Sequence, residues 1–235
     1  MRILRTTYYW IVVGLLFAIY SVLLSIMILF FSAPVVDSWL KKRFHFLFRL
    51  LHCPVEVSGQ EHIDPETTYL FMGNHLSLFD VPFLQAFIPV YARGVEARQH
   101  FKWPVYGWFI RRLGNIPIDR KNIHKSIQSI RKAEGRLKSG FSMIVLPEGH
   151  RTMDGKMRPF KKLPFFLAKQ SGTPIMPFGM SGLYTLKNKN SIHITPTPLK
   201  IKFGPVIPAE TVQKTPILEL MDTTRKRINQ LVEYP

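Results

Sequence analysis

Cysteine is nearly absent from this sequence, since Cys53 is the only one in 235 residues. An intramolecular disulfide is therefore excluded, and the composition fits a reducing compartment. A lone cysteine is more often a small apolar packing residue than a catalytic thiol, so we expect Cys53 to lie in a core. The length suits one domain with an appendage.

Acidic residues are missing from Gly155 to Ala209, although nine lysines and arginines fall there. The whole chain has 32 lysines and arginines against 15 acidic residues, a formal net charge of +17. Such a field attracts polyanions, whether nucleic acid, anionic lipid headgroups or phosphate-rich cofactors. The alternative is a set of solvated lysines that keeps the protein soluble.

Charge is also missing near the N-terminus, where 31 residues separate Arg5 from Asp37. About 20 apolar residues suffice to cross a bilayer as a helix, and this run is too long for a signal peptide. It predicts a membrane helix that either spans the bilayer or forms a hairpin in one leaflet. Pro34 should end or kink it. The mixture of aromatic and basic residues that follows predicts an amphipathic helix at the headgroups, or else a core helix.

Several catalytic signatures are not found. The sequence has no G-x-S-x-G nucleophile elbow, no Walker loop and no G-x-G-x-x-G, and its eight histidines lack the spacing of a zinc site. It also shows no recognisable nucleic-acid-binding module.

The remainder alternates short apolar runs with amphipathic stretches, which predicts an α/β layered domain. The predicted strands are Val55–Ser58, Thr68–Gly73, Ser142–Pro147, Ile175–Gly179 and Ile192–Phe203. The predicted helices are Ile123–Ser139, Lys161–Ser171 and Ile217–Val232.

The first polar block follows the strand that ends at Gly73. His75 lies where the chain turns, and Asp80 follows five positions later. If a helix starts near Ser77, Asp80 can fold back to His75, fix its tautomer and support a protonated imidazole. In the alternative, Asp80 only caps that helix and His75 is incidental.

A second block, residues 147–152, also follows an apolar strand. Arg151 offers a planar fork that suits phosphate, and Gly149 permits a close backbone approach. In the alternative, Glu148 and Arg151 simply form an ion pair. Two weaker blocks are Gly114–Arg120, a strand leading to a loop, and Thr173–Phe178, a buried strand punctuated by prolines.

Together these four blocks resemble the glycerolipid acyltransferase family, specifically the 1-acyl-glycerol-3-phosphate acyltransferases. His75 and Asp80 match its His-x-x-x-x-Asp signature, and Pro147–Arg151 is similar to its Pro-Glu-Gly-Thr-Arg block. Three features depart from the family pattern. His150 replaces threonine or serine, Phe160-Lys-Lys162 is followed by Leu163-Pro164, and Ala97-Arg98 stands where lysine is common.

The resemblance implies a mixed β-sheet flanked by helices, with the N-terminal hydrophobic helix and the basic amphipathic helix in front. It implies a membrane-embedded segment at 1–54 and a catalytic domain at 55–235. It makes His75 and Asp80 catalytic. The residues implied around the acceptor's glycerol phosphate are Glu148, Gly149, Arg151 and Arg120, assisted by Arg98 or Lys162.

The implied reaction moves a fatty acyl group from acyl-CoA or acyl-carrier protein to the sn-2 hydroxyl of lysophosphatidic acid. The product is phosphatidic acid for phospholipid biosynthesis. No metal or cofactor is expected beyond the thioester co-substrate. The expected partner is membrane lipid rather than nucleic acid, at the cell membrane with the catalytic domain on its cytoplasmic face. Two rivals stay open: another acceptor (a different lysophospholipid or glycerol 3-phosphate), or a non-catalytic basic protein that binds anionic lipid.

Overall fold

The computed structural model describes residues 2–119 and 123–234, with side chains throughout except at 123–125. Its elements in chain order are α1 Arg2–Phe30, α2 Ala33–Leu50, β1 Val55–Ser58, η1 Gln60–His62, β2 Leu70–Gly73, α3 Asp80–Phe87, β3 Ala92–Ala97, η2 Arg98–Lys102, α4 Tyr106–Arg112, β4 Ile116–Ile118, α5 Ile123–Lys138, β5 Ser142–Val145, α6 Leu163–Ser171, β6 Ile175–Ser181, α7 Leu183–Leu186, β7 Leu199–Phe203, α8 Ala209–Lys214 and α9 Ile217–Leu231.

Seven strands of the described chain form one mixed sheet in the order β1-β7-β6-β2-β5-β3-β4. The five strands from β6 to β4 are parallel, while β7 runs antiparallel to β6 and β1 runs parallel to β7. Parallel neighbours require crossover connections, which the helices provide. The predicted mixed sheet with flanking helices is therefore confirmed.

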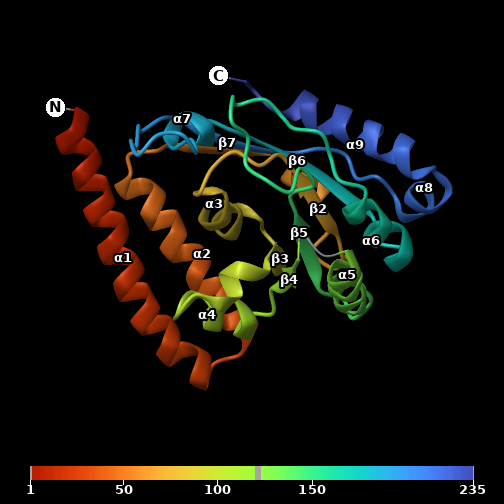
Figure 1. Cartoon of the computed structure of the whole chain (residues 1–235), viewed down its shortest axis with the longest axis horizontal. Helices are drawn as coiled ribbons and strands as arrows, with labels where there is room; N and C mark the ends of the chain where they lie inside the picture. The colour runs from red at the N-terminus through yellow and green to blue at the C-terminus, as the bar shows by residue number, and fades with distance from the viewer. Residues whose placement is uncertain (1, 120–122, 235) are drawn as a thin grey trace.

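Helices cover both faces of the sheet (Figure 1), and an apolar core lies beneath each layer. On β2, Phe71 enters the core beneath α2 and α3, while Leu70 and Met72 enter the core beneath α5, α6 and α9. The helices that follow the adjacent strands β2 and β5 therefore lie on opposite faces. The carboxyl ends of two strands whose helices diverge in this way are the usual ligand position in such sheets.

The N-terminal helices form an antiparallel pair (Figure 1). α1 ends at Phe30, and Pro34 lies in the first turn of α2, as predicted. α2 buries Leu47 and Phe48 in the core and leaves Lys42 and Arg49 exposed. It is therefore both a basic amphipathic helix and a core helix, so the two predicted interpretations each describe one of its faces.

Most predicted elements are present within a few residues of their predicted bounds, and one strand was overextended. The chain from Ile192 to Pro198 is irregular, and β7 begins only at Leu199. Pro196 and Pro198 have no N–H to donate to a ladder, which explains the late start. The predicted domain boundary falls after residue 54, just before β1. The division into two units stays a prediction.

Candidate active site

His75 and Asp80 are in direct contact beyond the carboxyl end of β2. His75 Nδ1 lies 2.6 Å from Asp80 Oδ2. The Asp80 side chain is fully buried, whereas the His75 side chain keeps 17% of its surface exposed. The pairing places the proton of the neutral imidazole on Nδ1, which leaves Nε2 to accept another. The predicted convergence of these two groups is confirmed.

The Asp80 carboxylate is fixed by the chain that precedes it. Leu76 N–H donates to Oδ2 at 2.7 Å, and Ser77 N–H donates to Oδ1 at 2.9 Å. The helix predicted near Ser77 begins at Asp80 itself, and the Ser77 hydroxyl donates to the Lys187 carbonyl while accepting from Phe79 N–H at 3.3 Å. The interpretation of Asp80 as a mere helix cap is therefore wrong, because its oxygens orient the His75 loop.

The second block holds the backbone of His75 in place. Glu148 Oε1 accepts from His75 N–H at 2.7 Å, and the Thr152 N–H donates to the His75 carbonyl at 2.9 Å. Glu148 Oε2 accepts from Arg158 N–H at 2.7 Å. Burial raises the pKa of Glu148 to about 7, although both hydrogen bonds oppose the rise. With both oxygens engaged by backbone, Glu148 is placed to position His75.

Arg151 is left without a counter-charge by this arrangement. Among the described residues, no carboxylate forms an ion pair with its guanidinium, so the predicted alternative of a Glu148–Arg151 pair is wrong. A second cation lies nearby: Lys187 is only 8% exposed and donates to the Asn188 carbonyl. Burial, and then the positive charge of Arg151, lower the pKa of Lys187.

Two neighbouring cations without a carboxylate between them favour an anion. Lys187 was not among the predicted site residues, because it lies outside the four blocks. The only signal that pointed to it was its place in the acid-free stretch.

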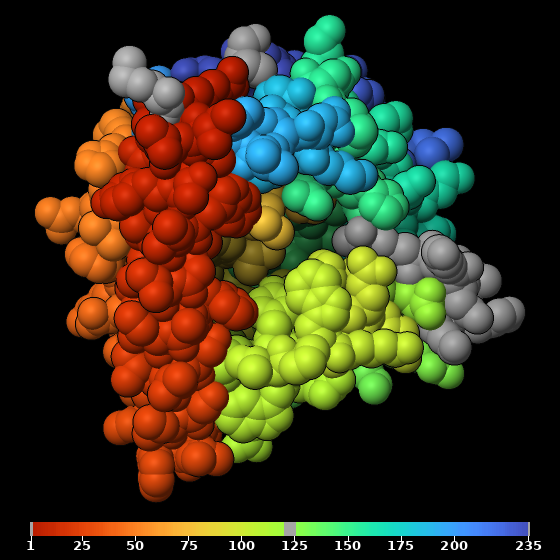
Figure 2. All heavy atoms as spheres, turned by 60° about the vertical axis from the view of Figure 1, so that its left-hand side comes forward, coloured from red at the N-terminus to blue at the C-terminus, as the bar shows by residue number. Residues whose placement is uncertain are grey.

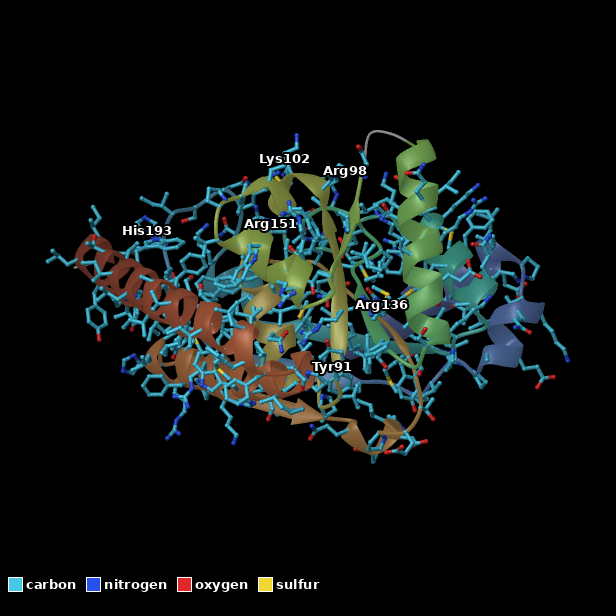
Figure 3. All side chains as sticks on the ribbon, turned by 90° about the horizontal axis from the view of Figure 1, so that it is seen from below. Tyr91, Arg98, Lys102, Arg136, Arg151 and His193 are labelled. Carbon is cyan, nitrogen blue, oxygen red and sulfur yellow. The ribbon has the colours of Figure 1, made fainter. Side chains whose placement is uncertain are left out.

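The other predicted residues are less closely involved. Gly149 has φ +74°, a conformation that favours glycine, and Lys162 is exposed where α6 begins. Arg98 Nε lies 3.7 Å from Asp119 Oδ2 and is 44% exposed. Arg120 lies outside the described residues. Figure 3 shows Arg98 and Arg151 toward one end of the sheet, with Tyr91 toward the other.

A hollow on one face of the molecule leads to this region (Figure 2). α1 borders it on one side and the η2–α4 segment on another, while the segment after α7 closes its upper edge. The floor of the hollow, coloured gold and green, is formed by the α3 region and by the chain after β5. The two blocks that carry the dyad and Arg151 therefore meet beneath an open surface flanked by an apolar helix.

Comparisons with known proteins agree with this geometry. A model of the family described as Acyltransferase matches residues 54–181. A 1-acyl-sn-glycerol-3-phosphate acyltransferase of Limnanthes alba is 33% identical over 155 residues, covering 66% of this chain and 54% of that protein. The alpha enzyme of that name from Ovis aries is 29% identical over 172 residues, 73% of this chain and 60% of that protein. The chain thus spans little more than half of these relatives.

The solved structure of PlsC, a 1-acyl-sn-glycerophosphate (LPA) acyltransferase from Thermotoga maritima, has a TM-score of 0.85 to this chain at 24% identity. The similarity covers 98% of this chain and 94% of that one, and it establishes a shared fold. The matched family region contains the dyad, Glu148 and Arg151, together with the strands that carry them. This chain therefore belongs to the acyltransferase family.

Proposed function

We propose that the protein transfers a fatty acyl group from a thioester carrier to the sn-2 hydroxyl of lysophosphatidic acid, giving phosphatidic acid. The observation that carries the proposal is the 2.6 Å contact between a partly exposed imidazole and a fully buried carboxylate. The names of the relatives support the choice of acceptor.

In the proposed reaction, His75 Nε2 takes the proton of the acceptor hydroxyl while Nδ1–H remains bonded to Asp80. The oxygen attacks the thioester carbonyl, and the tetrahedral intermediate collapses to the new ester and a thiolate. The imidazolium then returns its proton to the thiolate sulfur. This route uses no acyl-enzyme and no cofactor beyond acyl-CoA or acyl-carrier protein as donor.

The acceptor phosphate is bound by Arg151, with Lys187 adding a second positive charge. The guanidinium can hold two phosphate oxygens at once, and the half-buried setting strengthens the attraction. The acid-free stretch then increases the local concentration of both the acceptor and the phosphate-bearing donor.

Membrane association follows from α1, which is long and apolar enough to cross a bilayer. Both ends of α1 pack on the rest of the protein: Tyr9 lies 3.3 Å from His52 at one end, and Leu24 and Ile28 meet α4 near the other. A helix that packs on the domain near both of its ends cannot cross the bilayer unless the domain also enters the hydrocarbon. We therefore favour embedding in one leaflet of the cell membrane, with the catalytic domain on the cytoplasmic face.

The test is an acceptor panel assayed with purified protein and both donors: lysophosphatidic acid, other lysophospholipids, glycerol 3-phosphate and a phosphate-free monoacylglycerol. Arg151→Ala should raise KM for phosphate-bearing acceptors about 10- to 100-fold, since a charge-assisted hydrogen bond contributes about 1.5–3 kcal/mol. Lys187→Gln should act in the same direction, and the exposed Lys189→Gln is the matched control. An equal loss for the phosphate-free acceptor would contradict the phosphate role. Lipid binding without any acyl transfer would favour a non-catalytic protein.

A further inference from the structure

The η2–α4 segment presents three large apolar side chains to the surface. Trp103, Val105 and Trp108 are 52%, 48% and 37% exposed. They lie within six positions of one another, and the η2–α4 segment that carries them borders the hollow (Figure 2). An exposed cluster of this kind, with two tryptophans, is typical of a contact surface rather than of free solvent exposure.

The backbone holds this cluster outward at a conformational cost. Val105 has φ +60° and ψ −65°, in a tight turn in which Tyr106 N–H donates to the Pro104 carbonyl. This region is unfavourable for a β-branched residue, so the surrounding structure must impose it.

The constraint comes from Glu96, a buried carboxylate on β3. It accepts from the Tyr106 hydroxyl at 3.0 Å and from Asn115 Nδ2 at 2.6 Å, and it lies 3.3 Å from His100 Nδ1. The turn is thereby fastened to the sheet on both sides. The three apolar side chains stand on a rigid base rather than on a loose loop.

The cluster continues the apolar surface of α1. Phe109 and Leu113, at the other side of α4, pack with Leu24 and Ile28 of α1 in one buried cluster. The outward-facing side chains of α1 include exposed apolar residues such as Val22. α1 and α4 therefore pack together, and each presents apolar side chains at the surface.

Positive charge flanks the same segment. Arg98 and Lys102, in η2, lie at the end of the molecule away from Tyr91 (Figure 3). Tryptophan beside lysine and arginine is the composition found at the boundary between acyl chains and headgroups. A partner protein would require no such continuity with a membrane helix.

We infer that residues 103–108 form a second membrane contact, which inserts Trp103, Val105 and Trp108 into the headgroup boundary of the leaflet that holds α1. The inference rests on the membrane association proposed above. With α1 on one side of the hollow and this contact on another, the opening faces the lipid. A lysophospholipid then reaches His75 by moving along the leaflet instead of leaving it.

Tryptophan fluorescence tests this contact on the full chain. All four tryptophans are replaced by phenylalanine, and a single tryptophan is then restored at 103 or 108, or introduced as Val22→Trp on α1 or Leu218→Trp on α9. Each protein is bound to phospholipid vesicles whose acyl chains carry bromine near the headgroup. We expect strong quenching for Trp103, Trp108 and the Val22 reporter, and none for the exposed Leu218 reporter.

The reporters distinguish the second membrane contact at residues 103–108 from the membrane anchor α1. Quenching of the Val22 reporter without quenching of Trp103 and Trp108 would overturn the second contact and leave the α1 anchor standing. No quenching at any position would refute membrane association itself, and the contact with it.

Val105→Asn adds a functional measurement that does not depend on folding damage. Val105 has φ +60° and ψ −65°, which lies outside the left-handed region that asparagine favours, but asparagine lacks the β-branch that is costly there. The variant should therefore be about as thermally stable as the parent. Its KM for long-chain acceptor in vesicles should nevertheless rise about three- to tenfold, because an apolar contact is lost. KM for a short-chain, water-soluble acceptor should not change. Val105→Leu, which keeps the apolar contact, is the matched control. An unchanged vesicle KM in Val105→Asn would count against the contact.

Discussion

The dyad makes a quantitative prediction that a double-mutant cycle can test. Asp80→Asn removes one negative charge and replaces one acceptor oxygen by a donor. If the amide nitrogen takes the place of Oδ1, the bonds from His75 and Leu76 survive and only Ser77 N–H loses its acceptor. One unsatisfied buried N–H costs about 1–3 kcal/mol, which lowers the melting temperature by roughly 2–4 °C per kcal/mol in a chain of this size.

The effect on rate should be far larger than the effect on folding. His75 keeps its orientation in Asp80→Asn, but the imidazolium loses the carboxylate that supports it. General-base catalysis contributes about 10²- to 10⁴-fold, so kcat should fall by that amount, about 2.7–5.5 kcal/mol in activation free energy. His75→Ala should abolish transfer down to a small residual rate, which sets the baseline of the cycle, while the protein stays folded and bound to membrane.

The cycle compares the two single variants with the double variant, using initial rates of acyl transfer and thermal unfolding of each protein. Because Asp80 is proposed to act through His75, Asp80→Asn should change kcat by less than about threefold in the His75→Ala background. Near-normal turnover in His75→Ala would refute the reasoning. An equally large fall in kcat on Asp80→Asn in the His75→Ala background would also refute it, since the carboxylate would then act independently of the imidazole.

Three further predictions concern stability. Because burial raises the pKa of Glu148 from 4.5 to about 7, the folded state keeps its proton longer than the unfolded state. Between pH 4.5 and pH 7.5 the free energy of unfolding, measured in urea, should therefore fall by about 1–3 kcal/mol more in wild type than in Glu148→Gln. An equal fall in both proteins would contradict the raised pKa of Glu148. Asp37→Ala should cost about 3–5 kcal/mol, because it leaves Arg93 buried without its 2.8 Å partner. Asp37→Leu combined with Arg93→Met should recover much of that loss, and a failure to do so would argue against the charge explanation. Gly149→Ala should lower the melting temperature by a few degrees, because φ is +74° there, and an unchanged value would exclude strain.

The dyad is predicted from two signals: its local spacing, which leaves the helix-cap alternative open, and the resemblance of four ordered blocks to the acyltransferase family, which makes both residues catalytic. Five positions separate His75 from Asp80, and an apolar strand ends just before them. Strands such as Val55–Ser58 were equally visible, since an uninterrupted apolar or alternating run fixes both their existence and their approximate ends.

The missed strand β3 shows what such patterns cannot convey. Its sequence includes Arg93 and Glu96, which suggest an exposed segment when taken alone. In the fold Arg93 pairs with Asp37 of α2, and Glu96 accepts a hydrogen bond from the Tyr106 hydroxyl at the start of α4. The partners that neutralise these residues are distant in sequence or belong to unpredicted elements.

The same limit applies to the site. The position of Glu148 beside the His75 N–H links residues 73 positions apart, and nothing in the Pro-Glu-Gly block distinguishes a substrate ligand from a backbone anchor. The side chain of Lys187 comes close to that of Arg151 only in the folded structure, where β6 and α7 lie between the two residues in the chain.

The pairing of β1 with β7 affects the order of events during synthesis. Val55 lies beside Leu199 in the register, so the strand that directly follows the helical pair has its ladder partner near the end of the chain. A ribosome delivers α1 and α2 long before β7, and β1 must wait as an unpaired edge through most of translation. If α1 binds lipid as proposed, the α1–α2 pair can therefore reach the membrane before β1 has gained its ladder partner.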